Sequence, residues 1–420
     1  MPNNNNTMFR RRDYLKITLL GFALTALSQS LHSIILPQRI LDFVPETQKN
    51  TYLGLMTLTG LLLAVFVQPI AGAFSDRSGS KWGRRRPYIL VGGILMILII
   101  PGIGFAGSYA ALFIVYCLLQ VAGNTAQGPF QALIPDLAPA DKRGLASGVK
   151  ALLETVGGAS LVYVSSLFIN RYAAGEGAGW LWLVLVILDA VLLITLIAMM
   201  VLVREKPATA DKQQVSIWSS LLQTVRQITS RRDLVWFLLS RLLVYMAFTT
   251  IQQFAQYYLR DVVGVVNPAE STARFLVVAV AGMLLVVWPA GYLSDRIGRK
   301  PISFIAGLLG AGGIGIILSS HAYSTILWAA GIIGLAMGAF NAANWALATD
   351  LVSKGEEARY LGIANMATAG GAALARVIGP IIDAVNNHSR NWSGYNVMLW
   401  ACIGYFVIGA LLVFKVKRQV

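Results

Sequence analysis

Polar amide side chains recur at helical spacing in a stretch of the chain that is otherwise apolar. Gln120, Asn124, Gln127 and Gln131 are separated by four, three and four positions, which puts them on one face of a helix. An amide both donates and accepts hydrogen bonds, so this row suits a ligand rich in hydroxyl groups. The same row could instead join two helices inside a bilayer. We expect the ligand-binding use, through Asn124, Gln127 and Gln131.

Three other apolar stretches offer further candidate ligand-binding groups. These are Gln29 and His32, then Gln252 and Gln253, and then Asn341, Asn344 and Trp345. The ring of Trp345 could stack on an apolar ring face or pack against its neighbours, and the sequence leaves both uses open. His32 could titrate, although a lone histidine in an apolar helix is more often simply hydrogen-bonded.

Charged residues inside apolar stretches are costly and therefore indicate function. Lys150 and Glu154 are four positions apart and can pair on one helix. We expect Glu154 to bind a coupling proton while Lys150 competes for its charge; a static ion pair is the alternative. Arg241 and Arg376 complete the set of candidate coupling residues, because neither has a well-placed acidic partner in its own apolar stretch.

One motif occurs twice in the chain. AGAFSDRSGSKWGRRRP begins at Ala71 and AGYLSDRIGRKP begins at Ala290, so that their aspartates are 219 positions apart. A second echo, ALIPDL and ALATDL, places two further aspartates 214 positions apart. Two echoes of nearly equal offset predict an internal duplication.

The repeated motif is also a candidate gate. We expect its glycines to let helices approach closely, and its aspartates to accept charge-assisted bonds across the seam between the two halves. Charge that merely sets membrane topology is the alternative. The candidate gating residues are Gly72, Asp76, Arg77, Arg84 and Arg85 in the first copy, and Gly291, Asp295, Arg296 and Arg299 in the second.

Composition places these residues in a membrane. The 420 residues are 56% hydrophobic and only 13% charged, about half the charged fraction of a soluble domain. A membrane-spanning helix needs about 20 apolar residues. Twelve such stretches are centred near Ala26, Leu62, Leu95, Leu118, Val156, Val191, Met246, Leu284, Leu308, Met337, Ala369 and Val407.

The net charge of +15 follows this topology. The tails and alternate loops on one side hold 25 of the 34 basic residues, whereas the other side holds six. Positive charge accumulates on the cytoplasmic side of a membrane. We therefore expect both termini in the cytoplasm of a multi-pass protein of the cell membrane, and no binding to nucleic acid.

Motifs for other chemistry are missing from the sequence. It contains neither a phosphate-binding loop nor a nucleophile–base arrangement, and its two cysteines, Cys117 and Cys402, lie in predicted spans without disulfide or metal-ligand spacing. We expect neither an enzyme nor a metal site nor a cofactor. The energy for the protein's activity is expected to come from a transmembrane H⁺ or Na⁺ gradient.

The twelve stretches divide into two halves. We predict a cytoplasmic tail over residues 1–13, a six-helix half over 14–203, a linker over 204–233 and a second six-helix half with a short tail over 234–420. Apolar residues at helical spacing over 215–228 predict an amphipathic helix in the linker. Such a helix could lie on the membrane surface or tie the halves together.

The motifs resemble those of a known family. The paired Ser-Asp-Arg loops resemble the cytoplasmic signature of the major facilitator superfamily. The longer first copy, with VAGNTAQGPFQALIPDL, resembles the sucrose transporter / glycoside–pentoside–hexuronide cation symporter group. The resemblance implies an all-α membrane protein of twelve transmembrane helices in two pseudo-symmetric six-helix halves. Gln120 and Gln131 depart from it, since that group carries charged residues there, linked to sugar and proton handling.

The resemblance implies a secondary active transporter that works by alternating access. We expect a monomer that imports a sugar or glycoside with a proton or another cation, and that binds this solute between spans 1, 4, 7 and 10. Two alternatives remain open at this stage. One is a proton-coupled exporter of drugs or other amphipathic compounds on the same fold, and the other is a non-transporting membrane protein for pigment handling, lipid handling or assembly.

Overall fold

The computed structural model describes residues 10–205, 232–351, 357–389 and 391–416, and these are helical apart from short connections. The first part of the chain contains α1 (Arg11–Ser30), a π-helical turn (Leu31–Ile35), α2 (Leu36–Leu41), a 3₁₀ turn (Glu46–Gln48), α3 (Lys49–Asp76), α4 (Arg86–Ile99), α5 (Pro101–Phe105), α6 (Tyr109–Leu137), α7 (Arg143–Ala173) and α8 (Gly179–Leu202). The linker helix expected over 215–228 lies outside the described residues.

The second part repeats this series of helices. It contains α10 (Arg232–Tyr258), a second π-helical turn (Leu259–Val263), α11 (Pro268–Ile297), α12 (Arg299–Ser319), α13 (Tyr323–Asp350), α14 (Glu357–Leu374), a 3₁₀ turn (Ala375–Ile378), α15 (Gly379–Ser389) and α16 (Ser393–Leu412).

Twelve of the helical stretches in the described residues are long and apolar enough to cross a membrane. Each of the twelve predicted centres falls inside one of them, so the predicted spans are confirmed. The helical form follows from the solvent, because a lipid-embedded backbone must satisfy its polar groups internally. The chain is a multi-pass membrane protein.

The contacts divide the chain into two units. Unit 1 comprises Met1–Ile35 and Thr59–Gln213, and unit 2 comprises Leu36–Leu58 and Gln214–Val420. The segment Leu36–Leu58, which the sequence places in the first six-helix half, therefore packs with unit 2. One bond that holds it there runs from the Tyr257 hydroxyl on α10 to the carbonyl oxygen of Pro37, at 2.8 Å.

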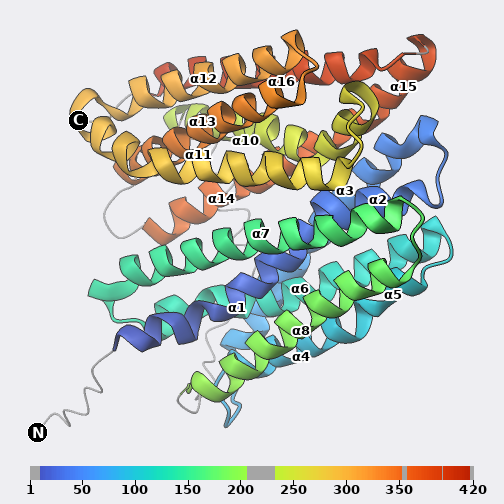
Figure 1. Ribbon diagram of the computed structural model, residues 1–420. Helices are drawn as coiled ribbons and strands as arrows, with labels where there is room; N and C mark the ends of the chain where they lie inside the picture. The colour runs from blue at the N-terminus through green and yellow to red at the C-terminus, as the bar shows by residue number, and fades with distance from the viewer. Residues whose placement is uncertain (1–9, 206–231, 352–356, 390, 417–420) are drawn as a thin grey trace, which may run out of the picture. The chain divides into compact units, whose positions relative to one another are not determined.

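The two units pair their helices in the same way. In unit 1, α1 packs against α7 and α8, and α4 packs against α6 and α8. In unit 2, α10 packs against α14 and α16, and α12 packs against α13 and α16. Figure 1 shows α12 and α16 side by side. The shared pairing confirms two pseudo-symmetric halves, as the repeated motif predicts.

Small residues set the distance between α11 and α13. A Cβ atom at Gly334 would lie 2.0 Å from the carbonyl oxygen of Ala279, and one at Gly338 would lie 2.5 Å from that of Met283. Because lipid offers no hydrophobic drive between helices, such close contact supplies the packing energy.

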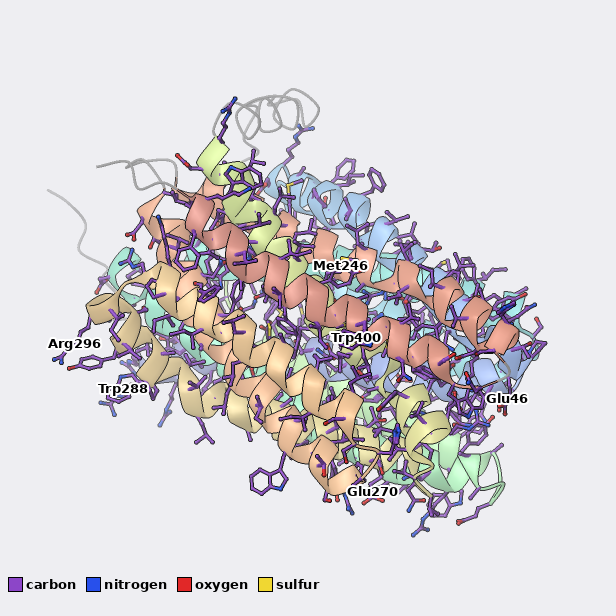
Figure 2. All side chains as sticks on the ribbon, turned by 90° about the horizontal axis from the view of Figure 1, so that it is seen from above. Glu46, Met246, Glu270, Trp288, Arg296 and Trp400 are labelled. Atoms are coloured by element: carbon purple, nitrogen blue, oxygen red, sulfur yellow. The ribbon has the colours of Figure 1, made fainter. Side chains whose placement is uncertain are left out.

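The lipid-facing side of α11 is different. Trp288 is 79% exposed and stacks on Tyr292. Figure 2 shows Trp288 and Arg296 pointing away from the helices, towards one end of α11, while Glu270 lies near the other end.

Candidate functional site

The amide row of α6 is built as its spacing predicts, and it is joined to neighbouring helices. The Asn124 amide donates to the Gln120 carbonyl oxygen at 2.8 Å and to its Oε1 at 3.3 Å. At the other end of the row, Gln68 of α3 donates to Gln131 Oε1 at 3.1 Å. Gln120, Asn124 and Gln127 are part-exposed and Gln131 is exposed, so the row keeps surface for a ligand.

His32 lies in the first π-helical turn and bonds to α6 within unit 1. Its Nε2 is 2.8 Å from the Tyr116 hydroxyl and 3.4 Å from Gln120 Nε2, and its Nδ1 is 2.6 Å from the Ser28 carbonyl oxygen. Gln29 lies on α1, just before this turn. Its side chain packs against α7, 3.5 Å from where a Cβ atom at Gly158 would lie. The structure thus brings His32 and the α6 row together.

Unit 2 contains a second polar cluster, on α10, α13 and α14. The Tyr245 hydroxyl donates to Asn341 Oδ1 at 2.5 Å, and Arg241 Nη1 donates to Asn344 Oδ1 at 2.6 Å. The Arg241 guanidinium also lies 4.6 Å from the centre of the Trp345 ring. Asn341, Asn344 and Trp345 are therefore neighbours around one arginine. Towards the far end of α10, Gln252 is part-buried and Gln253 is buried.

Arg241 is held without an acidic partner among the described ion pairs. Its side chain is buried, and its Nε donates to Thr368 Oγ1 at 2.8 Å and to the Ala364 carbonyl oxygen at 3.1 Å. Arg376 lies in the 3₁₀ turn between α14 and α15 and donates to the Ala372 carbonyl oxygen. These bonds join both arginines to neutral oxygen atoms of unit 2.

Lys150 and Glu154 form the ion pair that their spacing predicts. Lys150 Nζ lies 3.1 Å from Glu154 Oε1, and the two side chains are 19% and 22% exposed. Glu154 Oε1 lies against α1, about 3.0 Å from the position of a Cβ at Gly21. A charged, part-accessible carboxylate therefore lies inside span 5.

The first copy of the repeated motif forms an ion cluster around Arg85. Its guanidinium bonds Asp76, and its Nε donates to Asp136 Oδ2 at 2.8 Å. Arg84 adds a bond from Nη2 to Asp136 Oδ1 at 2.6 Å. Glu205, beyond α8, accepts the Arg85 backbone N–H at 2.9 Å. Burial raises the pKa of the Glu205 carboxyl, against the opposing effect of this bond.

The second copy repeats the arrangement in unit 2. Arg299 bonds Asp350 and lies 3.8 Å from Asp295. It also donates to the Ala346 carbonyl oxygen at 2.9 Å. Arg296 instead stacks over the Tyr292 ring, 4.5 Å from its centre. The two sequence echoes thus meet in space, because in each copy a motif arginine, Arg85 or Arg299, bonds the aspartate at the end of the fourth helical span of its half.

The motif bonds described here lie within one unit each. Arg77 is exposed on unit 1. A Cβ at Gly72 or Gly291 would meet nothing within 4 Å in the described structure. The close approach of α3 and α6 is set by Gly128 of α6, where a Cβ would lie 2.6 Å from the Gln68 carbonyl oxygen and 3.4 Å from the Gly72 backbone nitrogen.

Unit 2 holds a buried charged cluster that the sequence does not reveal. Lys49 Nζ, at the start of α3, lies 2.6 Å from Asp261 Oδ2 in the second π-helical turn, and their side chains are 0% and 3% exposed. The Tyr395 hydroxyl donates to the same Asp261 oxygen at 2.6 Å. Asp383 of α15 accepts the Thr51 backbone N–H at 2.6 Å and the Asn50 amide at 2.8 Å.

Several of these partners escape sequence reasoning. Tyr116, Tyr245 and Thr368 are common residue types in apolar helices, and no pattern separates them from packing residues. The motif partners Asp136 and Asp350 were detectable, since their offset nearly matches that of the motif. Among the described residues, no group of His, Cys, Asp and Glu could hold a metal ion.

Comparison with known proteins places this geometry in a family. The sequence model of the family described as MFS/sugar transport protein matches residues 47–415. A sucrose transport protein of Arabidopsis thaliana (SUC3) is 31% identical over 153 residues, covering 31% of this chain and 24% of the relative. One of Oryza sativa subsp. japonica (SUT1) is 37% identical over 116 residues, covering 22% of each. The matches thus span about a quarter of these curated relatives.

Solved structures share the whole fold. The crystal structure of a D-xylose-proton symporter has a TM-score of 0.72 at 17% identity and covers 97% of both chains. That of the nucleoside transporter NupG has a TM-score of 0.74 at 16% identity and covers 96% of this chain and 98% of that one. These likenesses establish the major facilitator fold, and with the family model they show that this chain belongs to the MFS/sugar transport protein family.

Proposed function

We propose that this protein is a secondary active transporter that imports a sugar or glycoside together with a proton or another cation. The observation that carries the proposal is the bonded polar face of unit 1, where His32, Gln120 and Asn124 form one hydrogen-bonded row. A row of amides matches the alternating donors and acceptors of sugar hydroxyl groups. The family match and the sucrose transport proteins among the relatives support the same solute class.

Unit 2 adds groups of a kind that suits a sugar. Asn341 and Asn344 are held by Tyr245 and Arg241, so their amides are fixed in direction before a ligand arrives. Trp345 is part-buried and lies against Arg241, which leaves an aromatic ring beside two amides. Such fixed polar groups reduce the ordering cost of binding.

The proposed energy source is an ion gradient across the cell membrane. The charge asymmetry of the loops supports cytoplasmic termini, and we propose that the protein works as a monomer, without covalent chemistry on the solute. Glu154 is the proposed coupling carboxylate. Lys150 would hold its charge in one state, and loss of that contact would let Glu154 take up a proton.

Transport in proteoliposomes tests the solute and the gradient together. The purified full-length chain is reconstituted, and uptake of radiolabelled sucrose, maltose and methyl glucoside is measured under an imposed proton gradient, an imposed sodium gradient and no gradient. We expect accumulation of at least one sugar under one gradient only. Efflux of amphipathic dyes without movement of any sugar would instead favour an exporter, and no flux of either kind would contradict transport.

Glu154→Gln tests the coupling residue. The substitution keeps the side chain's shape but removes its charge, so gradient-driven accumulation should be lost while counterflow exchange of sugar continues. Glu270→Gln is the control, because Glu270 is paired with Arg274 at the far end of α11 in unit 2. Accumulation that survives in Glu154→Gln would show that coupling lies elsewhere.

A further inference from the structure

His32 has a defined arrangement around both ring nitrogen atoms. Nδ1 lies 2.6 Å from the carbonyl oxygen of Ser28, one turn earlier on α1. A carbonyl oxygen only accepts, so Nδ1 must carry a hydrogen. The proton that His32 gains or loses therefore belongs to Nε2, the atom that faces Tyr116 and Gln120.

The π-helical turn places this nitrogen. Leu31–Ile35 forms a single turn of π-helix in span 1, a feature that often marks functional sites. His32 is part-buried in this turn, whereas the Tyr116 side chain on α6 is 1% exposed. The Tyr116 hydroxyl fits because α3 has Gly60 opposite it, where a Cβ would lie 2.3 Å from that oxygen.

We propose that His32 Nε2 is a proton-binding site whose occupancy sets the hydrogen-bonding pattern of the α6 amide row. This inference rests on the proposed proton-coupled transport and assigns a second protonation site to it. Glu154 lies against Gly21, eleven residues earlier on α1, or about 16 Å along the helix. The two sites are therefore distinct.

Protonation of Nε2 changes what its partners must do. In the neutral ring, Nε2 accepts hydrogen bonds from the Tyr116 hydroxyl at 2.8 Å and from the Gln120 amide at 3.4 Å. A protonated Nε2 donates, so Tyr116 must accept and the Gln120 amide must turn its oxygen towards the ring. Gln120 Oε1 then leaves Asn124, which keeps its 2.8 Å bond to the Gln120 carbonyl oxygen.

The turned amide offers donors to a solute. Gln120 Nε2 is released from His32, whereas the neutral form holds it. Sugar oxygens accept such donors, so the protonated form should bind sugar more tightly. By linkage, sugar should also strengthen proton binding by the same factor.

The ionisable groups around the π-helical turn are few. On α6 they include Tyr116 and Cys117, and on α7, which packs against the turn, the ionisable residues after Gly158 are Tyr163, Arg171 and Tyr172. The carboxyl group on α8 is Asp189. Arg39, seven residues after His32 on α2, is paired with Asp42 at 2.5 Å. The two hydrogen-bond partners that we assign to Nε2, the Tyr116 hydroxyl and the Gln120 amide, are neutral groups.

Nuclear magnetic resonance of the full-length protein tests the site without any sugar. The chain has three histidines, so ¹⁵N-labelled imidazole signals are assigned with His32→Gln, His321→Gln and His388→Gln. At pH 8.5 we expect a proton on His32 Nδ1 and none on Nε2. As the pH is lowered from 8.5 to 5.5, Nε2 should gain a proton and the Gln120 amide signals, assigned with Gln120→Asn, should shift with the same midpoint.

Sucrose affinity gives a second readout of the same switch. Binding to the wild-type protein should be about fivefold tighter at pH 5.5 than at pH 8.0, the lower end of typical site-to-site coupling. His32→Gln, checked for folding by thermal unfolding, should reduce this ratio below about twofold, and the other two histidine variants should keep it.

The outcomes separate this inference from the proposed function. A proton on Nε2 at high pH, no titration of His32, or Gln120 signals that ignore it would each overturn the switch, even if sugar is transported. A titrating His32 with the expected Gln120 response in a protein that neither binds nor moves sugar would contradict the proposed function alone.

Discussion

The two π-helical turns in the described part of the chain place an ionisable residue against a buried tyrosine in two different ways. In unit 1, Leu31–Ile35 holds His32, whose partners are Tyr116, Gln120 and a backbone carbonyl. In unit 2, Leu259–Val263 holds Asp261, which accepts a bond from Tyr395 but is also paired with Lys49.

The two turns differ in how a change of charge on the ionisable residue would affect its partners. At His32 a proton turns Nε2 from an acceptor into a donor, and Tyr116 and the Gln120 amide can each present an oxygen to it, so its hydrogen bonds are satisfied in both states. At Asp261 a neutral side chain would remove the nearer of the two carboxylates that compensate Lys49, whose side chain is fully buried. An uncompensated buried charge costs several kcal/mol. A π-helical turn therefore supports a protonation switch in unit 1 and a fixed ion pair in unit 2.

Asp261→Asn should break the second arrangement with the largest effect. The variant leaves the buried Lys49 ammonium with only the exposed Glu46 carboxylate, 3.7 Å away, and removal of one partner of a buried pair typically costs about 3–5 kcal/mol. We expect a strong fall in the thermal unfolding temperature in detergent.

The double variant Lys49→Met with Asp261→Asn is the matched control, because it removes both charges. It should recover most of the lost stability, since an uncharged pair needs no compensation. Equal losses in the single and double variants would show that the ion pair itself is unimportant there. His32→Gln should leave the unfolding temperature almost unchanged, which keeps the contrast between the two turns.

The two copies of the repeated motif also differ in how deeply their arginines are buried, and we expect a smaller effect on stability there. Arg85 has a side chain 6% exposed and bonds Asp76, Asp136 and Ser75, whereas the Arg299 side chain is 23% exposed. Hydrogen bonds of charged groups contribute about 1.5–3 kcal/mol each when buried, and exposed pairs below about 1 kcal/mol. Arg85→Gln should therefore lower the unfolding temperature clearly more than Arg299→Gln. Equal shifts would contradict the importance of burial at this motif.

The fold could be predicted from the sequence because lipid imposes its own rule. A run such as Leu181–Met199 must be helical whatever its neighbours, and the two motif copies reveal the duplication directly. The packing of Leu36–Leu58 with unit 2 could not be predicted in this way. It depends on contacts such as that of Tyr257 with Pro37, which join positions 220 residues apart.

The candidate site was predictable only where one helix carries the pattern. Helical spacing alone places Asn124 beside Gln120, and Lys150 beside Glu154. It says nothing about which side chain of another helix will meet His32. A π-helical turn also cannot be recognised from residue types, because the extra residue that it inserts into the helical hydrogen-bond pattern can be of any type.

Tyr116→Phe should have the smallest effect on stability, and it tests which partner of His32 carries the change at the unit 1 turn. The ring remains, so packing against Gly60 is kept, and one hydrogen bond of about 1 kcal/mol is lost. His32 should keep its Nδ1 proton, since Ser28 still accepts it, and Nε2 should still titrate. The Gln120 amide should then respond more strongly, because it becomes the one remaining side-chain partner that we assign to Nε2. A Gln120 response that disappears in Tyr116→Phe would instead show that the tyrosine hydroxyl, and not the amide, carries the change in protonation to the α6 row.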